Sequence, residues 1–454
     1  MGNHRFGLNS FGRRGSWLVV AGMIVLTAGC RPAGRTDAQA SEMAQSTNDI
    51  QSAAPAATPP PAPVDTTPQT YELTADALDY RLPATALEDG WVRLFDGATL
   101  FGWEIAGAAN WRVEDQSITV SGGQRSLLCT SMPWQDYDLR LEFRCDQETN
   151  SGLFLRTPLE PQDVALECYE VNIAPPSNPF PTGSVVKRKR IEGVVDEWSS
   201  SKWHLYEIRV SGREVEIKLD GKVVNQYVDP VDLSNGRVGL QYNAGAIAFR
   251  DIRLRPLGYR SLLKDTDGAQ GEDAATPLAH WKQYPDMDGN FAMNDDDQLH
   301  ITGGRGQLES KESFGDFTLF ATTKTSSPNL NGGIFFRCMP GDQMMGYECQ
   351  ISHEMKDNDP MQPADCGTGG IFRRQDARVI AGADQKWSRL LLRVAGDRMA
   401  AWVDGIAVSD WRDTRPENEN PRKGKRLQAG TLMLQAHDPT TDILVQDLLI
   451  VKDR

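Results

Sequence analysis

Two short segments place a glutamate inside an apolar, alternating run. They read YEVNI at residues 169–173 and YECQI at residues 347–351. Successive side chains of a strand point to opposite faces, so each glutamate would lie opposite the tyrosine before it. Each segment follows a run that ends in an arginine, Arg156 or Arg337, and His437 follows the second. Carboxylate, guanidinium and imidazole groups can together supply a general base, a cation for a developing negative charge and a general acid.

The elements that must position these groups are predicted to be β-strands. Apolar and polar residues alternate over residues 206–210 and again over 215–220. Asp220-Gly221 then leads into Val223, which is a strong hairpin signal. The chain also contains 41 Gly and 26 Pro among 454 residues, which suits a turn-rich protein. Many short strands at regular spacing predict an all-β protein, either a two-sheet sandwich or a jelly roll.

The globular part of the sequence is internally duplicated. Matching segments recur in the same order in both halves: NSGLFLR at 150–156 and NGGIFFR at 331–337, the two glutamate segments, TGSV at 182–185 and TGGI at 368–371, and KWHLYEIRVSG at 202–212 and KWSRLLLRVAG at 386–396. The spacing is far longer than a solenoid repeat. We therefore expect two tandem domains, over residues 88–258 and 278–453, with a boundary in the Gly/Asp/Ala-rich stretch near residues 264–277.

The set of motifs resembles the 3-keto-disaccharide hydrolase domain family. The first copy opens with LFDGATLFGW at 94–103 and WRVED at 111–115, and it closes with FRDIRL at 249–254. The resemblance implies a concanavalin-like jelly-roll fold and cleavage of glycosides whose C3 hydroxyl has been oxidised to a ketone. Some family members are described as lyases and hydratases. The expected architecture is two tandem concanavalin-like jelly-roll sandwiches after a disordered N-terminal spacer.

Each copy departs from the family pattern in one place. The second copy keeps Trp281 but has no LFDG run near its start. The first copy reads QYN at 241–243, where the family commonly shows Gln-x-His, whereas the second reads QAH at 435–437. The departure puts catalysis by the first copy in doubt more than catalysis by the second.

The implied chemistry assigns a role to each candidate residue. A C3 ketone acidifies the C2 hydrogen, a base removes it, and the enolate expels the C1 substituent before water adds back. The candidates are Glu348 as base, Arg337 or Arg374 as enolate stabiliser and His437 as acid, with Glu170 and Arg156 as the counterparts in the first copy. The structural alternatives are a cross-strand ion pair between Glu348 and Arg337, and a surface position for His437.

We expect a glycoside or oligosaccharide ligand and no cofactor. Residues 286–290, DMDGN, look calcium-like, but Phe291 stands where an EF-hand loop needs glycine. The fold type still leaves room for a structural calcium ion. The formal net charge of −14 argues against a nucleic-acid partner, because such binding relies on clustered positive charge.

The N-terminus has the features of a bacterial export signal. Arg5, Arg13 and Arg14 precede an apolar run over residues 17–26, which is too short to span a bilayer. LTAGC at 26–30 resembles a lipobox, so residues 1–30 are predicted to be a lipoprotein signal peptide with lipidation at Cys30. Residues 31–80, rich in Ala and Pro, are predicted to be a disordered spacer. The expected location is extracytoplasmic, anchored by lipid to a bacterial membrane.

The sequence thus favours an exported enzyme that cleaves 3-keto-glycosides by hydrolysis or by elimination and hydration. An alternative from a different class is a non-catalytic carbohydrate-binding surface lipoprotein. A structural adhesion module is a third and weaker alternative.

Overall fold

Antiparallel strands are the dominant secondary structure of the described chain, and its helices are few and short, which confirms the all-β prediction. The computed structural model describes residues 65–67, 72–193, 198–199, 202–264 and 278–454. The predicted signal peptide, Cys30 and residues 31–64 of the predicted spacer lie outside the described residues.

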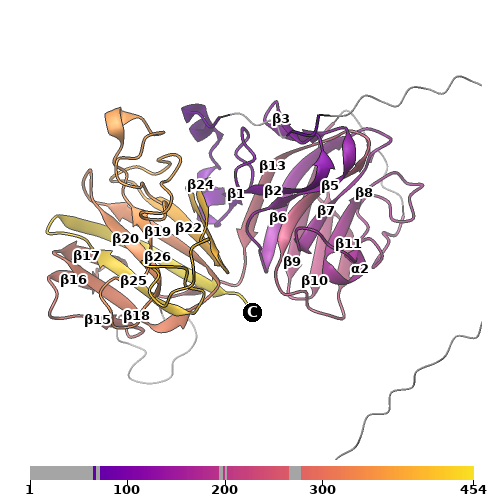
Figure 1. Cartoon of the computed structure of the whole chain (residues 1–454). Helices are drawn as coiled ribbons and strands as arrows, with labels where there is room; N and C mark the ends of the chain where they lie inside the picture. The colour runs from indigo at the N-terminus through magenta and orange to yellow at the C-terminus, as the bar shows by residue number, and fades with distance from the viewer. Residues whose placement is uncertain (1–64, 68–71, 194–197, 200–201, 265–277) are drawn as a thin grey trace, which may run out of the picture. The chain divides into compact units, whose positions relative to one another are not determined.

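Among the described residues, the first copy has the strands β1 to β13 before the linker, several of which are labelled in Figure 1. They are β1 (Val92–Arg93), β2 (Trp103–Ala109), β3 (Arg112–Glu114), β4 (Ser117–Val120), β5 (Gly123–Thr130), β6 (Tyr137–Cys145), β7 (Asn150–Thr157), β8 (Tyr169–Ile173), β9 (His204–Ser211), β10 (Glu214–Leu219), β11 (Lys222–Val228), β12 (Arg237–Ala244) and β13 (Ile247–Pro256). The short helices in this described part are η1 (Ala75–Tyr80), α1 (Ala84–Glu88) and α2 (Val164–Glu167).

The second copy repeats this arrangement. Its elements are β15 (Trp281–Gln283), β16 (Gly289–Met293), β17 (Leu299–Gly303), β18 (Gly306–Phe314), β19 (Phe317–Thr325), β20 (Gly332–Cys338), β21 (Tyr347–Ile351), η3 (Lys356–Asn358), β22 (Ser388–Ala395), β23 (Arg398–Val403), β24 (Ile406–Arg412), β25 (Gly430–Ala436) and β26 (Thr441–Lys452). The short strand β14 (Arg260–Ser261) pairs with β26 and so joins a sheet of the second copy.

The two copies have the same sheet topology. The five-stranded sheets run β2-β5-β12-β7-β8 and β15-β18-β25-β20-β21. The eight-stranded sheets run β11-β10-β9-β6-β13-β4-β3, with β1 added on β13, and β16-β17-β26-β19-β22-β23-β24, with β14 added on β26. The five-stranded orders match strand for strand, and the eight-stranded orders match when the second is read from β24 to β16, so the duplication seen in the sequence is a duplication of the whole sandwich.

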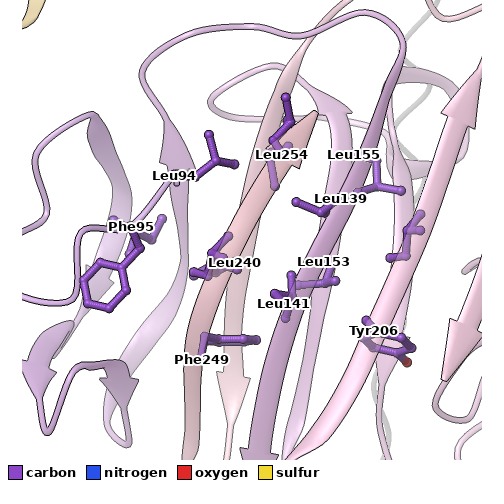
Figure 2. Close-up of a cluster of buried hydrophobic side chains, with 14 of the residues drawn as sticks. Leu94, Phe95, Leu139, Leu141, Leu153, Leu155, Tyr206, Leu240, Phe249 and Leu254 are labelled. Atoms are coloured by element: carbon purple, nitrogen blue, oxygen red, sulfur yellow. The ribbon is translucent and has the colours of Figure 1, made fainter. Parts of the chain in front are cut away.

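Apolar side chains from the facing sheets fill the interior of each sandwich. Figure 2 shows this for the first copy, where Leu139, Leu141 and Phe249 of one sheet lie near Leu153 and Leu240 of the other. All five side chains are fully or almost fully buried. Since alternate residues of each strand fill this core, the residues between them must point to the opposite face of their sheet.

The last part of the predicted spacer forms regular structure. Residues 75–80 form η1, and Leu73 and Leu78 pack against the apolar core of the second copy. Residues 72–80 can bury apolar surface because they contain these two leucines. The Ala/Pro-rich sequence before them has few large apolar side chains. The prediction of disorder up to residue 80 is therefore wrong for this last part.

Candidate functional site

A cavity of about 660 Å³ lies on the outer face of the five-stranded sheet of the second copy. Strand β21 builds its floor by simple alternation. Tyr347, Cys349 and Ile351 point into the core, whereas Glu348 and Gln350 line the cavity. The prediction that these two polar residues share one face of the strand is confirmed.

Glu348 is almost completely enclosed at this floor, with 7% of its surface exposed. Burial raises the pKa of its carboxyl to about 7, Asp365 raises it further, and Arg422 and Arg373 lower it. The neighbouring strand makes room for the side chain at Gly333, where a Cβ atom would lie 2.9 Å from Glu348 Oε1. A carboxyl group with such a pKa can accept or release a proton near neutral pH.

Amide side chains line the cavity together with Glu348, and two of their oxygen atoms have no hydrogen-bond partner. Gln350 donates from Nε2 to Asn331 Oδ1 at 3.1 Å, and Asn331 donates from Nδ2 to Asp365 Oδ2 at 2.8 Å. The side-chain oxygens of Gln350 and Gln435 are buried and have no hydrogen-bond partner. Since buried polar atoms are normally paired, these two oxygens are suited to accept hydrogen bonds from ligand hydroxyls.

Two guanidinium groups near Glu348 were missed by the sequence analysis. Arg422, in the connection between β24 and β25, donates from Nη2 to the carbonyl oxygen of Met344 at 2.8 Å. Arg373 adopts a left-handed backbone with φ of 58°. Arg373 lies two residues after the TGGI segment, and Lys187 lies two residues after TGSV. The duplication therefore indicated a positive charge at this position in both copies. Arg422 had no such signal, because the first copy has no comparable connection.

Arg337 does not face this cavity, which contradicts its predicted role. The register between β20 and β25 shifts between Phe335 and Cys338, and Arg337 has a φ of 47°. This irregularity breaks the alternation on which the prediction relied. The fully buried guanidinium donates to the carbonyl oxygen of Gly396 at 2.6 Å and to Asp316 Oδ1 at 2.6 Å. Arg337 therefore holds the sandwich together, and its carboxylate partner is Asp316 rather than Glu348.

Arg156 is buried in the same way in the first copy, and its predicted role is also wrong. Its φ is 51°, beside a register shift between β7 and β12. The guanidinium donates to Asp136 Oδ1 at 2.5 Å and to the carbonyl oxygen of Gly212 at 2.7 Å. Gly212 and Gly396 are matched in the repeat, so both copies bury the same structural arginine.

Arg374 lies beside the second cavity without lining it. Its guanidinium donates to the carbonyl oxygens of Arg373 at 3.2 Å and of Arg422 at 3.0 Å. Desolvation and the charge of Arg415 lower its pKa. Because its donors bind the backbone of Arg373 and Arg422, which both line the cavity, Arg374 is placed to hold these two residues rather than a ligand.

His437 lines the same cavity as Glu348, on the turn that follows β25. Its backbone N donates to Thr441 Oγ1 at 2.9 Å, and its Nδ1 lies 2.8 Å from Asp438 Oδ2. Hydrogen bonds from Thr440 and His437 lower the pKa of Asp438 to about 2. An ionised Asp438 orients the ring and leaves Nε2 for proton exchange.

The first copy has a matching cavity of about 520 Å³. Glu170 is 7% exposed in it. Burial raises its pKa to about 7, against the lowering effects of a Gln241 hydrogen bond and of Arg125 and Lys187. The side-chain oxygen of Gln241 is buried and unpaired as well. Asn243 stands where the second copy has His437, so this cavity lacks an imidazole at that position.

Neither a metal site nor a membrane helix is found in the part of the chain that the structure describes. No three His, Cys, Asp or Glu side chains within the described ranges are grouped so that they could hold a metal ion. No helix among the described residues is long and apolar enough to cross a membrane.

Comparison with known proteins gives one family match. A model of the 3-keto-alpha-glucoside-1,2-lyase-like domain matches residues 90–255 and again residues 270–444. No curated protein matches the chain. Among solved structures, a suspected glycosyl hydrolase from Parabacteroides distasonis is 16% identical, with 39% of this chain and 98% of that chain covered and a TM-score of 0.35. A carbohydrate-binding module, CBM66, from Bacillus subtilis is also 16% identical, with 34% and 95% covered and a TM-score of 0.28.

Proposed function

The chain belongs to the 3-keto-alpha-glucoside-1,2-lyase-like domain family, and from this premise we propose that it is an exported enzyme that cleaves 3-keto-glycosides. The family supports a carbohydrate-related function, and the second cavity supports catalysis. The observation that carries the proposal is the enclosed Glu348 carboxyl, with a pKa of about 7, beside two unpaired amide oxygens. A base of this pKa and acceptors for sugar hydroxyls are what the reaction requires.

The reaction proceeds by elimination followed by hydration. Glu348 takes the proton from C2, which the C3 ketone has acidified, and the electron pair of that bond forms an enolate. The enolate then expels the C1 oxygen, which takes a proton from His437 and leaves as an alcohol. Water adds to C1 of the unsaturated sugar and a proton returns to C2. The sum of the steps is hydrolysis of the glycoside to a 3-keto sugar and an alcohol.

Arg373 and Arg422 are the proposed enolate stabilisers in place of Arg337 and Arg374. Both line the cavity, and both lower the pKa of Glu348, so their positive charge acts at the site where negative charge develops. A preorganised cation at a developing enolate oxygen contributes to catalysis because it needs no reorganisation during the reaction.

The test is to incubate the purified chain with a 3-keto-disaccharide in D₂O. We expect free sugar to be released and deuterium to appear at C2 of the released 3-keto sugar. The Glu348→Gln variant should reduce both signals by at least about 10²-fold, and Glu419→Gln, a change at an exposed residue outside the cavity, should preserve both. Release without deuterium would contradict elimination. Binding without release would support the carbohydrate-binding alternative.

We also propose that the chain is lipidated at Cys30 and anchored to a bacterial membrane by this lipid, with the spacer between the lipid and the domains. The support is the basic, apolar and LTAGC sequence of residues 1–30. Acyl chains bury methylene groups at roughly 0.8 kcal/mol each, and stable anchoring needs more than one chain. A Cys30→Ser variant should move the protein from the membrane fraction to the soluble fraction. Unchanged fractionation would refute the anchor.

A further inference from the structure

One side of the first cavity is apolar, and it begins directly beside Glu170. Phe154 is the cross-strand partner of Glu170 in the register of β7 and β8, and it lines the cavity. Leu159 and Val164 line the cavity too, and both pack, partly buried, on a small apolar cluster that includes Phe154 and Leu127. The cavity therefore has a polar end at Glu170 and an apolar wall that continues from it.

The second cavity lacks this wall, although the second copy has a phenylalanine at the matching position, Phe335. Phe335 is the cross-strand partner of Glu348, but it does not line that cavity. Met344 packs with it in one cluster, and the guanidinium of Arg422 lies 5.7 Å from the centre of its ring. The same position thus presents an aromatic side chain to the cavity in one copy and is covered by a cation in the other.

We infer that the first cavity is a separate ligand site for glycosides whose leaving group is apolar. The leaving group lies against Phe154, Leu159 and Val164, and the sugar lies against Glu170 and the unpaired oxygen of Gln241. A cavity of about 520 Å³ in which an apolar wall meets convergent polar groups has the usual character of a small-molecule site. The inference depends on the proposed function in one respect only, namely that the sugar lying against Glu170 is a 3-keto sugar.

The experiment compares phenyl and methyl 3-keto-glucosides, each anomer in turn, by titration calorimetry. The protein is the full chain with both Glu170→Gln and Glu348→Gln, so that no ligand is turned over. We expect one of two sites to bind the phenyl ligand at least about tenfold more tightly than the methyl ligand, because the ring leaves water for the apolar wall. Adding Val164→Asn should reduce this preference to less than about threefold.

Leu166→Asn is the matched control. Leu166 belongs to the same short helix α2 but is 70% exposed and does not line the cavity, so this change should leave the preference as it was. The inference is overturned if no site prefers phenyl, if neither ligand binds, or if Val164→Asn leaves the preference intact. Failure of the proposed function is seen separately, as absence of sugar release by the unmodified chain.

Discussion

The two copies share the same arrangement of strands and differ in the residues that form the walls of their cavities. Glu170 and Glu348 occupy the same place in the same sheet, each 7% exposed and each with a pKa of about 7. The walls come from connections that differ. Between β7 and β8 the first copy inserts α2, whereas between β24 and β25 the second copy has the connection 413–429 that carries Arg422. The carboxyl group therefore has the same position in both copies because the strands that carry it pair in the same way, whereas the loops that surround it differ.

The largest expected difference between the copies is in catalysis. Glu348→Gln should lower kcat on a 3-keto-disaccharide by about 10²- to 10⁴-fold, because a general base contributes a factor of this size. Glu170→Gln should lower it less, since the first cavity has Asn243 where the second has His437. Steady-state kinetics of the two variants decides this. The reverse order would assign the main reaction to the first copy.

A second prediction concerns what the copies have in common. Arg156→Ala and Arg337→Ala should each reduce the free energy of unfolding by about 3–5 kcal/mol, because each removes a fully buried guanidinium that pairs with an aspartate and with backbone carbonyl oxygens. Denaturant unfolding of both variants provides the measurement. The side chains are both fully buried, so similar losses are expected. A large loss of stability in only one of the two variants would show that the two sandwiches do not depend equally on their buried arginine.

The pH dependence should also be the same in both copies. A folded pKa of about 7, above the usual 4.5 of a glutamate carboxyl, means that the protonated carboxyl is favoured in the folded state. The resulting stability is complete below pH 4.5 and is lost as pH rises through 7. Glu348→Gln and Glu170→Gln should therefore each gain on the order of 3 kcal/mol relative to the unmodified chain between pH 4.5 and pH 8.

Thermal unfolding of both variants across this pH range measures the gain. Activity has the opposite dependence, since the base must be ionised, and should rise with pH through about 7. A gain that is absent in one variant would show that its carboxyl has an ordinary pKa.

The smallest expected effect is at the glycines beside the two carboxyls. In Gly333→Ala the new Cβ would lie 2.9 Å from Glu348 Oε1, whereas in Gly152→Ala it would lie 3.5 Å from Glu170 Oε1. The first change should displace the carboxyl and lower kcat by roughly tenfold, because small misplacements of a catalytic group are costly. The second should move its carboxyl less. The shift of the pH–rate profile of each variant distinguishes a displaced base from a general loss of folding.

Much of the frame could be predicted from the sequence because it depends on local pattern. Alternation places Glu348 and Gln350 opposite Tyr347 in any regular strand, and the structure confirms this. The same reasoning failed for Arg337, since one residue out of register moves a side chain to the other face. Nothing in the segment NGGIFFR marks the shift in advance.

By itself, the sequence determined the all-β class, the duplication and the faces of the regular strands, because neighbouring residues set these features. Only the tertiary structure decided which charges meet. Arg422 is 74 residues beyond Glu348 in the sequence, and only the course of its connection brings it to the cavity. The raised pKa of Glu348 was equally out of reach, because desolvation depends on everything packed around the carboxyl.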